Sequence, residues 1–249
     1  MSGWDALDRI LNARAAAGRA ADFWWRDDDA TERTEALDRL LALRAALDVP
    51  LALAVIPATA TGALAEAVSG VSGIDVLQHG YAHVSHRPAG AKKAELAADR
   101  DVWDVARDIA DGRGRMIELF GDDGWLDVMV PPWNRIDATV AVLLPGLGFH
   151  GLTTFRGRNL EDASESLRLV NTHIDIVDWR TTRGFVGEEP LLNAAVEALE
   201  TDTPAVGLLT HHLAHDEACW DFIDRFVAAT RRCDTVRWRA ARDLFPAPA

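Results

Sequence analysis

The sequence predicts an α/β protein in which βα units surround a largely parallel sheet or barrel. Short apolar runs alternate with longer amphipathic stretches from about Ala21 to the end of the chain. The 249 residues, 49% of them hydrophobic, suffice for one large core. Several groups of Asp and His residues directly follow or end an apolar run. In parallel α/β folds the βα loops converge at the carboxyl ends of the strands, so these groups are expected on one face.

Seven apolar runs have the length of buried strands, and each is followed by polar or turn-forming residues. We expect strands at DFWWR (22–26), LALAVI (51–56), IDVLQ (74–78), LDVMV (126–130), FHGLTT (149–154), HIDIV (173–177) and AVGLLT (205–210).

Amphipathic stretches between these runs predict the helices, and Gly and Pro fall mostly between the elements. We expect helices at 32–47, across 91–120 with a break allowed, and at 137–144, 188–200 and 216–231. Residues 1–20 have a helical period and predict an added N-terminal helix. No repeat or low-complexity linker divides the chain, so residues 1–249 are expected to form a single domain.

Charge and composition exclude several classes of partner. The formal net charge of -13 is spread along the chain, which argues against nucleic acid. The N-terminal segment lacks the apolar core of a secretory signal, and no run approaches the roughly 20 apolar residues that span a bilayer. We therefore expect a cytoplasmic protein without a membrane partner. Cys219 and Cys233 are expected to be reduced packing residues, and the oligomeric state stays open.

The segment FWWRDDDAT places three consecutive aspartates, Asp27, Asp28 and Asp29, after the first strand. Neighbouring carboxylates repel one another, so a cation, hydrogen bonds or shared protons must offset the cost. A solvated cap of the helix at 32–47 is an equally good explanation of this segment alone.

The segment QHGYAHVSH brings His79, His83 and His86 after the strand at 74–78. Two imidazoles four residues apart can reach one ion, and neutral imidazole is a common metal ligand. Two histidines and one of the aspartates would form a facial triad that leaves positions open for water and substrate. Tyr81, the only tyrosine, either packs or reaches into the cleft.

Three further strand ends carry candidate residues. In VMVPPWNRID, two prolines stiffen the turn before Trp133, whose backbone N–H and ring could both face a ligand. In HIDIVDWR, either Asp175 or Asp178 could orient a histidine. In GLLTHHLAHDE, His211 is the first side chain past the strand and a candidate general acid. Each segment alone is also compatible with an ordinary packed loop.

The five segments, in this order and over roughly residues 22–215, resemble the NodB-type polysaccharide deacetylases of carbohydrate esterase family 4. The resemblance implies a distorted (β/α) barrel of about seven parallel strands. It also implies removal of an acetyl group from an N-acetylated or O-acetylated saccharide or a related small amide, through a metal-activated water. The implied cofactor is one divalent ion, zinc first, with cobalt, manganese, iron or nickel also compatible with these ligands.

Carried over residue by residue, the resemblance assigns a role to most of these side chains. Asp28 is the implied base, and Asp29, His79 and His83 are the implied metal ligands, although a shift to Asp27 and Asp28 stays open. The Trp133 N–H is implied to bind the oxyanion, and Asp178 to position the acid His211. The implied substrate pocket comprises Tyr81, Pro132, Arg135, Trp179 and Leu209.

The third motif departs from the family pattern. Where the family has Arg-Pro-Pro-Tyr, this chain has Val130-Pro131-Pro132-Trp133. The missing arginine usually orients the catalytic aspartate, so Arg26, Arg135 or Arg180 would have to replace it.

Two alternatives stay open, the second of them because of the missing arginine. One is another metal-dependent hydrolase of the same barrel, acting on a cyclic amide or a phosphoester. The other is a non-catalytic descendant that binds carbohydrate through Trp133 and Trp179. Because polymers usually lie outside the cell, a cytoplasmic enzyme favours a small or soluble saccharide as substrate.

Overall fold

The computed structural model describes residues 2–156, 160, 167–201 and 203–247. A parallel sheet forms its centre, with the strand order β6-β5-β4-β3-β2-β1-β8-β7 and β9 paired with β1. The strands are β1 (Ala21–Ala30), β2 (Leu51–Val55), β3 (Ile74–His79), β4 (Leu126–Val130), β5 (Gly151–Leu152), β6 (Arg168–Leu169), β7 (Ile174–Asp175), β8 (Val206–Thr210) and β9 (Val236–Trp238).

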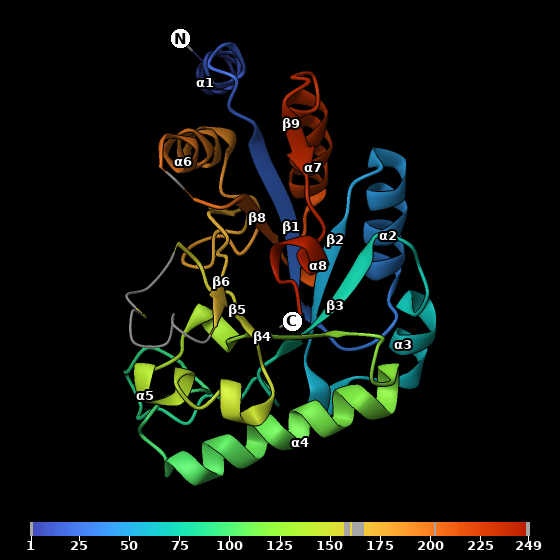
Figure 1. Ribbon diagram of the computed structural model, residues 1–249, viewed down its shortest axis with the longest axis vertical. Helices are drawn as coiled ribbons and strands as arrows, with labels where there is room; N and C mark the ends of the chain where they lie inside the picture. The colour runs from blue at the N-terminus through green and yellow to red at the C-terminus, as the bar shows by residue number, and fades with distance from the viewer. Residues whose placement is uncertain (1, 157–159, 161–166, 202, 248–249) are drawn as a thin grey trace.

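The two ends of this sheet approach each other. Phe155, just after β5, forms a parallel bridge with Thr172, just before β7. Backbone hydrogen bonds from Arg156 N to Thr172 O (2.7 Å) and from Thr172 N to Thr154 O (2.9 Å) support this contact. The sheet therefore curls into the distorted (β/α) barrel that the sequence predicts, with helices around the outside (Figure 1).

All seven predicted strands are present, and β6 and β9 are additional. These two have only two and three residues, Arg168–Leu169 and Val236–Trp238. Each contains an arginine, so neither forms an apolar run that would reveal it in the sequence. The strands predicted at 149–154 and 173–177 are shorter than expected, with two residues each.

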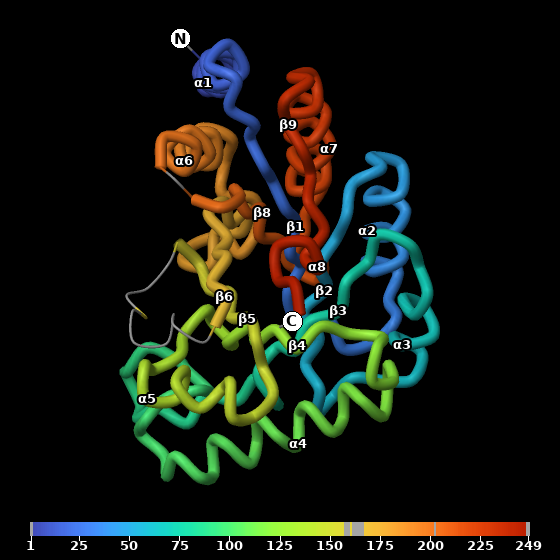
Figure 2. Tube along the Cα trace, viewed as in Figure 1, coloured from blue at the N-terminus to red at the C-terminus, as the bar shows by residue number. Residues whose placement is uncertain are grey.

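Helices alternate with the strands along the chain, and the colours from blue to red in Figure 2 trace this order. They are α1 (Gly3–Ala16), α2 (Glu35–Leu47), α3 (Gly62–Val68), α4 (Val102–Phe120), α5 (Ala138–Ala141), α6 (Glu188–Glu200), α7 (Glu217–Thr230) and α8 (Ala241–Leu244). The helix expected across 91–120 begins only at Val102, because the Asp101 carboxylate caps it by accepting the Trp103 N–H at 2.8 Å. Residues 91–101 are not helical.

The added N-terminal helix is present as α1 and begins with a capping box formed by Ser2 and Asp5. It buries Leu7 and Leu11 against the core. The Trp4 ring lies 6.1 Å from the Phe222 ring of α7, and its indole N–H donates to Glu188 of α6 at 2.8 Å. The helix therefore closes one side of the barrel between α6 and α7.

Side chains of β1 alternate between two apolar clusters, as the pleat requires. Phe23 and Trp25 pack outward among the surrounding helices. Trp24 points into the barrel, where its ring lies 6.0 Å from Phe245 next to α8. This apolar packing fills the interior at the amino ends of the strands, so the polar residues of β1 lie at the carboxyl end.

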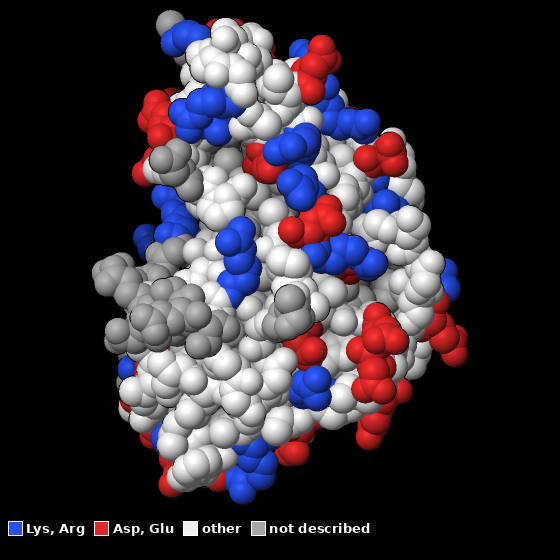
Figure 3. Space-filling view, viewed as in Figure 1, with Lys and Arg blue, Asp and Glu red and all other residues white. Residues whose placement is uncertain are grey.

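Both cysteines are free thiols, as predicted, with Cys219 buried and Cys233 partly buried. Within the described part of the chain, no helix is long and apolar enough to span a membrane. Acidic and basic side chains are interspersed on the face shown in Figure 3.

Candidate functional site

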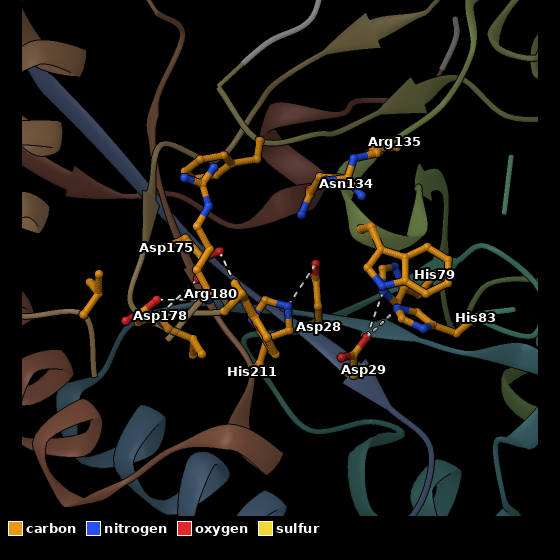
Figure 4. A pocket seen from close by; sticks show the side chains of 15 residues that line it. Asp28, Asp29, His79, His83, Asn134, Arg135, Asp175, Asp178, Arg180 and His211 are labelled. Atoms are coloured by element: carbon orange, nitrogen blue, oxygen red, sulfur yellow. Dashed lines mark hydrogen bonds and ion pairs between the residues drawn. The ribbon is translucent and has the colours of Figure 1, made fainter. Parts of the chain in front are cut away.

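A cavity of about 510 Å³ lies where the carboxyl ends of the strands meet. Its walls come from β1, β3 and the segments that follow β4, β7 and β8 (Figure 4). Nine of the residues that the sequence predicts for the site line it, namely Asp28, Asp29, His79, His83, Trp133, Arg135, Asp178, Trp179 and His211. The expectation that these distant segments meet on one face is therefore confirmed.

Asp29, His79 and His83 form a compact group of possible metal ligands. The Asp29 Oδ1 atom lies 3.0 Å from His79 Nε2 and 3.3 Å from His83 Nε2. One ligand atom from each of the three residues lies within 4.8 Å of the others. A carboxylate and two imidazoles with this spacing can hold a divalent transition-metal ion.

Contacts behind the group aim its ligand atoms at the cavity. His79 Nδ1 lies 2.9 Å from the Val130 carbonyl oxygen and can donate to it only when it carries the ring proton. The ring can also donate from Nε2 to Asp29 Oδ1 at 3.0 Å, and a bound metal would take the place of that Nε2 proton.

A bulge in β1 brings Asp29 into the cavity. In a regular strand Asp27 and Asp29 would share one face and Asp28 the other. The pairing with β2 shifts register between Asp27 and Ala30, and Asp29 has a φ of 70°. The backbone therefore turns at Asp29, and both Asp28 and Asp29 reach the cavity.

The electrostatics of the group suit a cation. Although burial raises it, the pKa of Asp29 is held well below its ordinary value by the hydrogen bond to His79 and by the charges of His79, His211 and His83. Burial and the charge of His79 lower the pKa of His83. Although burial lowers it, the pKa of His79 is raised by the hydrogen bond to Asp29 and by the charges of Asp28 and Asp29, so metal binding would displace a proton from His79. The residues present therefore fit a divalent ion.

Glu95 fixes the loop that carries His83, and sequence reasoning missed it. Its carboxylate, only 1% exposed, accepts the backbone N–H groups of Tyr81 at 3.0 Å, Ala82 at 2.8 Å and Val84 at 3.5 Å. His83 itself has a positive φ of 56°, which an unconstrained histidine rarely adopts. No motif in the sequence relates Glu95 to this loop.

Arg26 binds Asp28 in the interior of the barrel. Its Nε and Nη2 atoms donate to the two carboxylate oxygens of Asp28 at 2.8 and 2.9 Å, and both residues are 0% exposed. The same guanidinium donates to Thr153 Oγ1 at 2.8 Å and to Asn134 Oδ1 at 2.6 Å. Arg26, one of the three arginines considered from the sequence, therefore contacts the aspartate.

Asp27 lies outside the cavity. It accepts hydrogen bonds from the Thr210 hydroxyl at 2.6 Å and the His212 backbone N–H at 3.0 Å, and its Oδ1 lies 2.5 Å from His212 Nδ1. Both residues of this Asp27–His212 pair are buried. The alternative in which Asp27 and Asp28 form the functional pair is not supported by this placement.

His211 directly follows β8 and lines the cavity beside Asp28. Its Nε2 atom lies 4.0 Å from Asp28 Oδ2, and its ring meets the Trp179 ring edge to face at 4.6 Å. His211 therefore places a titratable ring next to the same carboxylate that Arg26 binds.

The expected contact between Asp178 and His211 is not present in the described structure. The Asp178 carboxylate instead accepts the backbone N–H groups of Arg180 and Thr181 at 3.0 and 3.1 Å within its own turn. Asp175 is the more buried of the two candidates and accepts the Trp179 indole N–H at 3.1 Å. Burial raises the pKa of Asp175, whereas the charge of His211 lowers it.

Trp133 forms the wall beside the ligand group. It follows Pro131 and Pro132 with a positive φ of 54°, and its ring lies 4.3 Å from the His83 ring. The two prolines hold this turn in place, and the indole shields one side of His83 from solvent.

Three residues predicted to line the substrate pocket lie elsewhere. Tyr81 lines a second hollow on the outer surface, beside Arg115 of α4. Pro132 is buried, and its ring packs so closely on Gly80 that a side chain at that position would clash with it. Leu209 is buried within β8, in register with Arg26. Strand alternation places Leu209 on the same face as Arg26 and His211, but one level before the cavity lining that His211 joins.

Comparison with known proteins identifies the fold. No protein-family model and no curated protein match the sequence. Among solved structures, the chain is similar to the Bc1960 peptidoglycan N-acetylglucosamine deacetylase, with 14% identity over 94% of this chain and 97% of that one and a TM-score of 0.59. A family 4 carbohydrate esterase from Streptomyces lividans in complex with acetate gives 14% identity, 88% and 91% coverage and a TM-score of 0.58.

A third solved structure, the family 4 acetyl xylan esterase from Clostridium thermocellum in complex with a cobalt ion, gives 14% identity. It covers 90% of both chains with a TM-score of 0.56. The resemblance read from the sequence motifs is thus confirmed at the level of the fold.

Proposed function

We propose that this protein is a metal-dependent deacetylase that removes an acetyl group from an N-acetylated or O-acetylated saccharide or a related small amide. One observation carries the proposal. A possible metal site on Asp29, His79 and His83, an aspartate bound by an arginine, and a histidine 4.0 Å from that aspartate all line one cavity. Solved deacetylases and esterases with this fold support the same reaction class.

Asp29, His79 and His83 would hold the metal ion. When bound, a divalent ion supplies a Lewis acid that lowers the pKa of a water and polarises an acyl oxygen. Zinc is the ion we expect, although one carboxylate and two imidazoles also accept cobalt, manganese, iron or nickel.

Asp28 would act as the general base that takes the proton of the attacking water. The bidentate bond from Arg26 fixes the direction of its carboxylate. An arginine from β1 would thereby do the work of the arginine that is missing from the third motif.

His211 would act as the general acid that protonates the leaving amine or alcohol. The sequence motif assigned its support to Asp178, but the partly buried Asp175 is the better candidate, because it lines the same cavity as His211 and reaches it through Trp179. Asp175 also binds the indole of Trp179, which packs on the His211 ring. The Trp133 backbone N–H would stabilise the oxyanion of the tetrahedral intermediate.

The geometry also bears on the alternatives. Many hydrolases of phosphoesters and cyclic amides hold two ions about 3.5–4 Å apart. Among the described residues, only one group of three or more ligands fits an ion, which favours a one-metal enzyme. A non-catalytic descendant would have little need to keep the buried Arg26–Asp28 pair, since a buried charge is costly without a function or a partner.

Metal analysis combined with an acetate-release assay tests the proposal. Wild-type protein should carry about one equivalent of a transition metal and release acetate from N-acetylated sugars. His79→Ala with His83→Ala should lose both properties, whereas His86→Ala, an exposed histidine of the same segment, should keep them. A wild-type protein that binds no zinc or cobalt, or that binds two equivalents, would contradict this assignment.

A further inference from the structure

The Asp27–His212 pair lies beside the proposed machinery but has no task in it so far. The two side chains are only 0% and 2% exposed, and neither of them lines the cavity. A buried carboxylate costs free energy unless hydrogen bonds compensate for its lost hydration. The contacts of Asp27 therefore indicate what the pair does in this fold.

Asp27 holds the two residues that flank His211. It lies opposite Thr210 in the pairing of β1 with β8 and accepts the Thr210 hydroxyl at 2.6 Å. It also accepts the backbone N–H of His212 at 3.0 Å, and its Oδ1 atom lies 2.5 Å from Nδ1 of the same residue. His211 thus lies between two residues that are tied to one carboxylate.

The pleat of β8 separates these ties from the cavity. Successive side chains along a strand point to opposite faces. His211 lines the cavity (Figure 4), whereas Thr210 before it and His212 after it bind Asp27 outside the cavity. The carboxylate can therefore restrain the backbone of His211 from behind without contacting its ring.

The groups that bind Asp27 are themselves held. The Thr210 hydroxyl donates to Asp27 and accepts the indole N–H of Trp25 at 2.8 Å, so its rotation is fixed from both sides. The His212 ring is engaged through Nδ1 alone, because its buried Nε2 atom has no hydrogen-bond partner among the described residues. Asp27 is therefore the polar partner that orients this ring.

The His211 ring depends on its backbone for its position. Its Nδ1 atom is buried and has no hydrogen-bond partner in the described part of the chain, and the expected contact with Asp178 is not present there. The ring packs on Trp179 at 4.6 Å, and the His211 backbone N–H donates to His215 Nε2 at 3.3 Å. Since no carboxylate hydrogen-bonds the ring directly, restraint of the flanking residues decides where Nε2 lies.

We propose that Asp27 and His212 are positioning residues that hold His211 at the place where it can protonate the leaving group. This inference rests on the proposed deacetylase function, in which His211 is the general acid. The pair contacts neither the cavity nor the possible metal ligands, so it acts only through His211. A misplacement of about 1 Å can cost roughly 10²-fold in rate, which sets the size of the effect.

The test compares two acetyl compounds that differ in their need for an acid, using the zinc-loaded protein. One is the N-acetylated sugar that the wild type turns over fastest, whose amine must be protonated as it leaves. The other is 4-nitrophenyl acetate, whose leaving group departs as a stable anion. We expect His212→Ala to lower kcat for the sugar roughly 10- to 100-fold and kcat for the ester by less than about threefold, with KM and zinc content retained.

Two variants separate positioning from a general loss of structure. His212→Asn presents an amide N–H where the histidine presents Nδ1, so it should recover most of the lost kcat. Arg242→Ala is the matched control, because it removes the partner of the buried Asp75 at the other end of the barrel, where Arg242 Nε donates at 2.6 Å. It should lower the stability but not change the ratio of the two kcat values.

A double variant tests whether His212 acts through His211. His211→Ala should itself spare the ester and slow the sugar, and adding His212→Ala to it should have little further effect, because the residue to be positioned is gone. Additive losses in the double variant would overturn the proposal. If His212→Ala does not fold, Thr210→Val cuts the other tie to Asp27 and should give the same selective loss.

Proton NMR gives a readout that needs no turnover. The Trp179 ring current shifts the Cε1–H resonance of His211, and this resonance should move in His212→Ala and return in His212→Asn. Such a movement in a protein that releases no acetate from either compound would support the positioning and refute the deacetylase. Acetate release with an unchanged resonance, or with equal losses for both compounds, would overturn the positioning and leave the deacetylase standing.

Discussion

Replacing Glu95 by alanine removes the carboxylate that accepts the backbone N–H groups of Tyr81 and Ala82, at 3.0 and 2.8 Å, in the loop that carries His83. A hydrogen bond to a charged group contributes about 1.5–3 kcal/mol. Two such bonds therefore hold the loop by about 3–6 kcal/mol, of which water recovers part, because this loop is half-buried. Without them the left-handed conformation of His83 loses its main restraint.

We expect Glu95→Ala to weaken zinc or cobalt binding by roughly 10- to 100-fold, the range found for residues that support metal ligands from behind. Glu95→Gln keeps one acceptor oxygen, so its affinity for the metal should lie between those of Glu95→Ala and the wild type. Competition with a chelator measures the affinity, and urea unfolding of the metal-free proteins measures the change in stability. The matched control is Glu66→Ala, an exposed glutamate of α3. A folded Glu95→Ala protein that binds metal within twofold of the wild type would refute this reasoning.

Two further predictions concern the buried Arg26–Asp28 pair and the partly buried His173. Arg26→Gln leaves Asp28 without its partner in the barrel interior and should lower the free energy of unfolding by about 3–5 kcal/mol in urea titrations, and adding Asp28→Asn should restore part of the loss. Burial lowers the pKa of His173 from its ordinary value to about 4, and its Nδ1 accepts the Gly207 N–H at 3.0 Å, so the folded state favours the neutral ring. The unfolded state binds a proton first as the pH falls, so this contribution is present above about pH 6.5 and is lost between about pH 6.5 and 4, by at most about 3 kcal/mol. His173→Asn keeps an acceptor that does not titrate and should flatten this part of the pH dependence of stability, and an unchanged slope would contradict the assignment.

The sequence predicts those parts of the fold that depend on local pattern. Each of the seven apolar runs forms a strand, because a short continuous apolar run between polar turns suits a strand that is covered on both faces of a parallel sheet. The strands β6 and β9 escape prediction because they are too short to show a pattern. The sequence does not predict the start of α4 at Val102, because the stretch before the Asp101 cap has an equally helical pattern.

The candidate site depends on contacts that no local pattern encodes. Strand alternation alone would place Asp27 and Asp29 on the same face, and the bulge at Asp29 reverses this. The motif assigned the support of His211 to Asp178, whereas in the structure the Asp178 carboxylate accepts backbone N–H groups of its own turn and Asp175 binds the indole that packs on His211. Glu95 accepts hydrogen bonds from a loop 11–14 residues before it, and the spacing of residues in the sequence does not predict this contact.

The position of the arginine shows how a departure from a motif can keep its chemistry. Arg26 and Asp28 are two residues apart on one strand, so the pleat alone points both side chains into the barrel. Position 130 is then free to carry valine, which is buried in the apolar interior, while its carbonyl still binds His79 Nδ1. Restoring the motif by Val130→Arg would add a second buried cation beside Arg26, and its desolvation would cost several kcal/mol without a free carboxylate to offset it. Under the proposed function an arginine in the third motif is not required, because Arg26 supplies the guanidinium from the strand that carries Asp28.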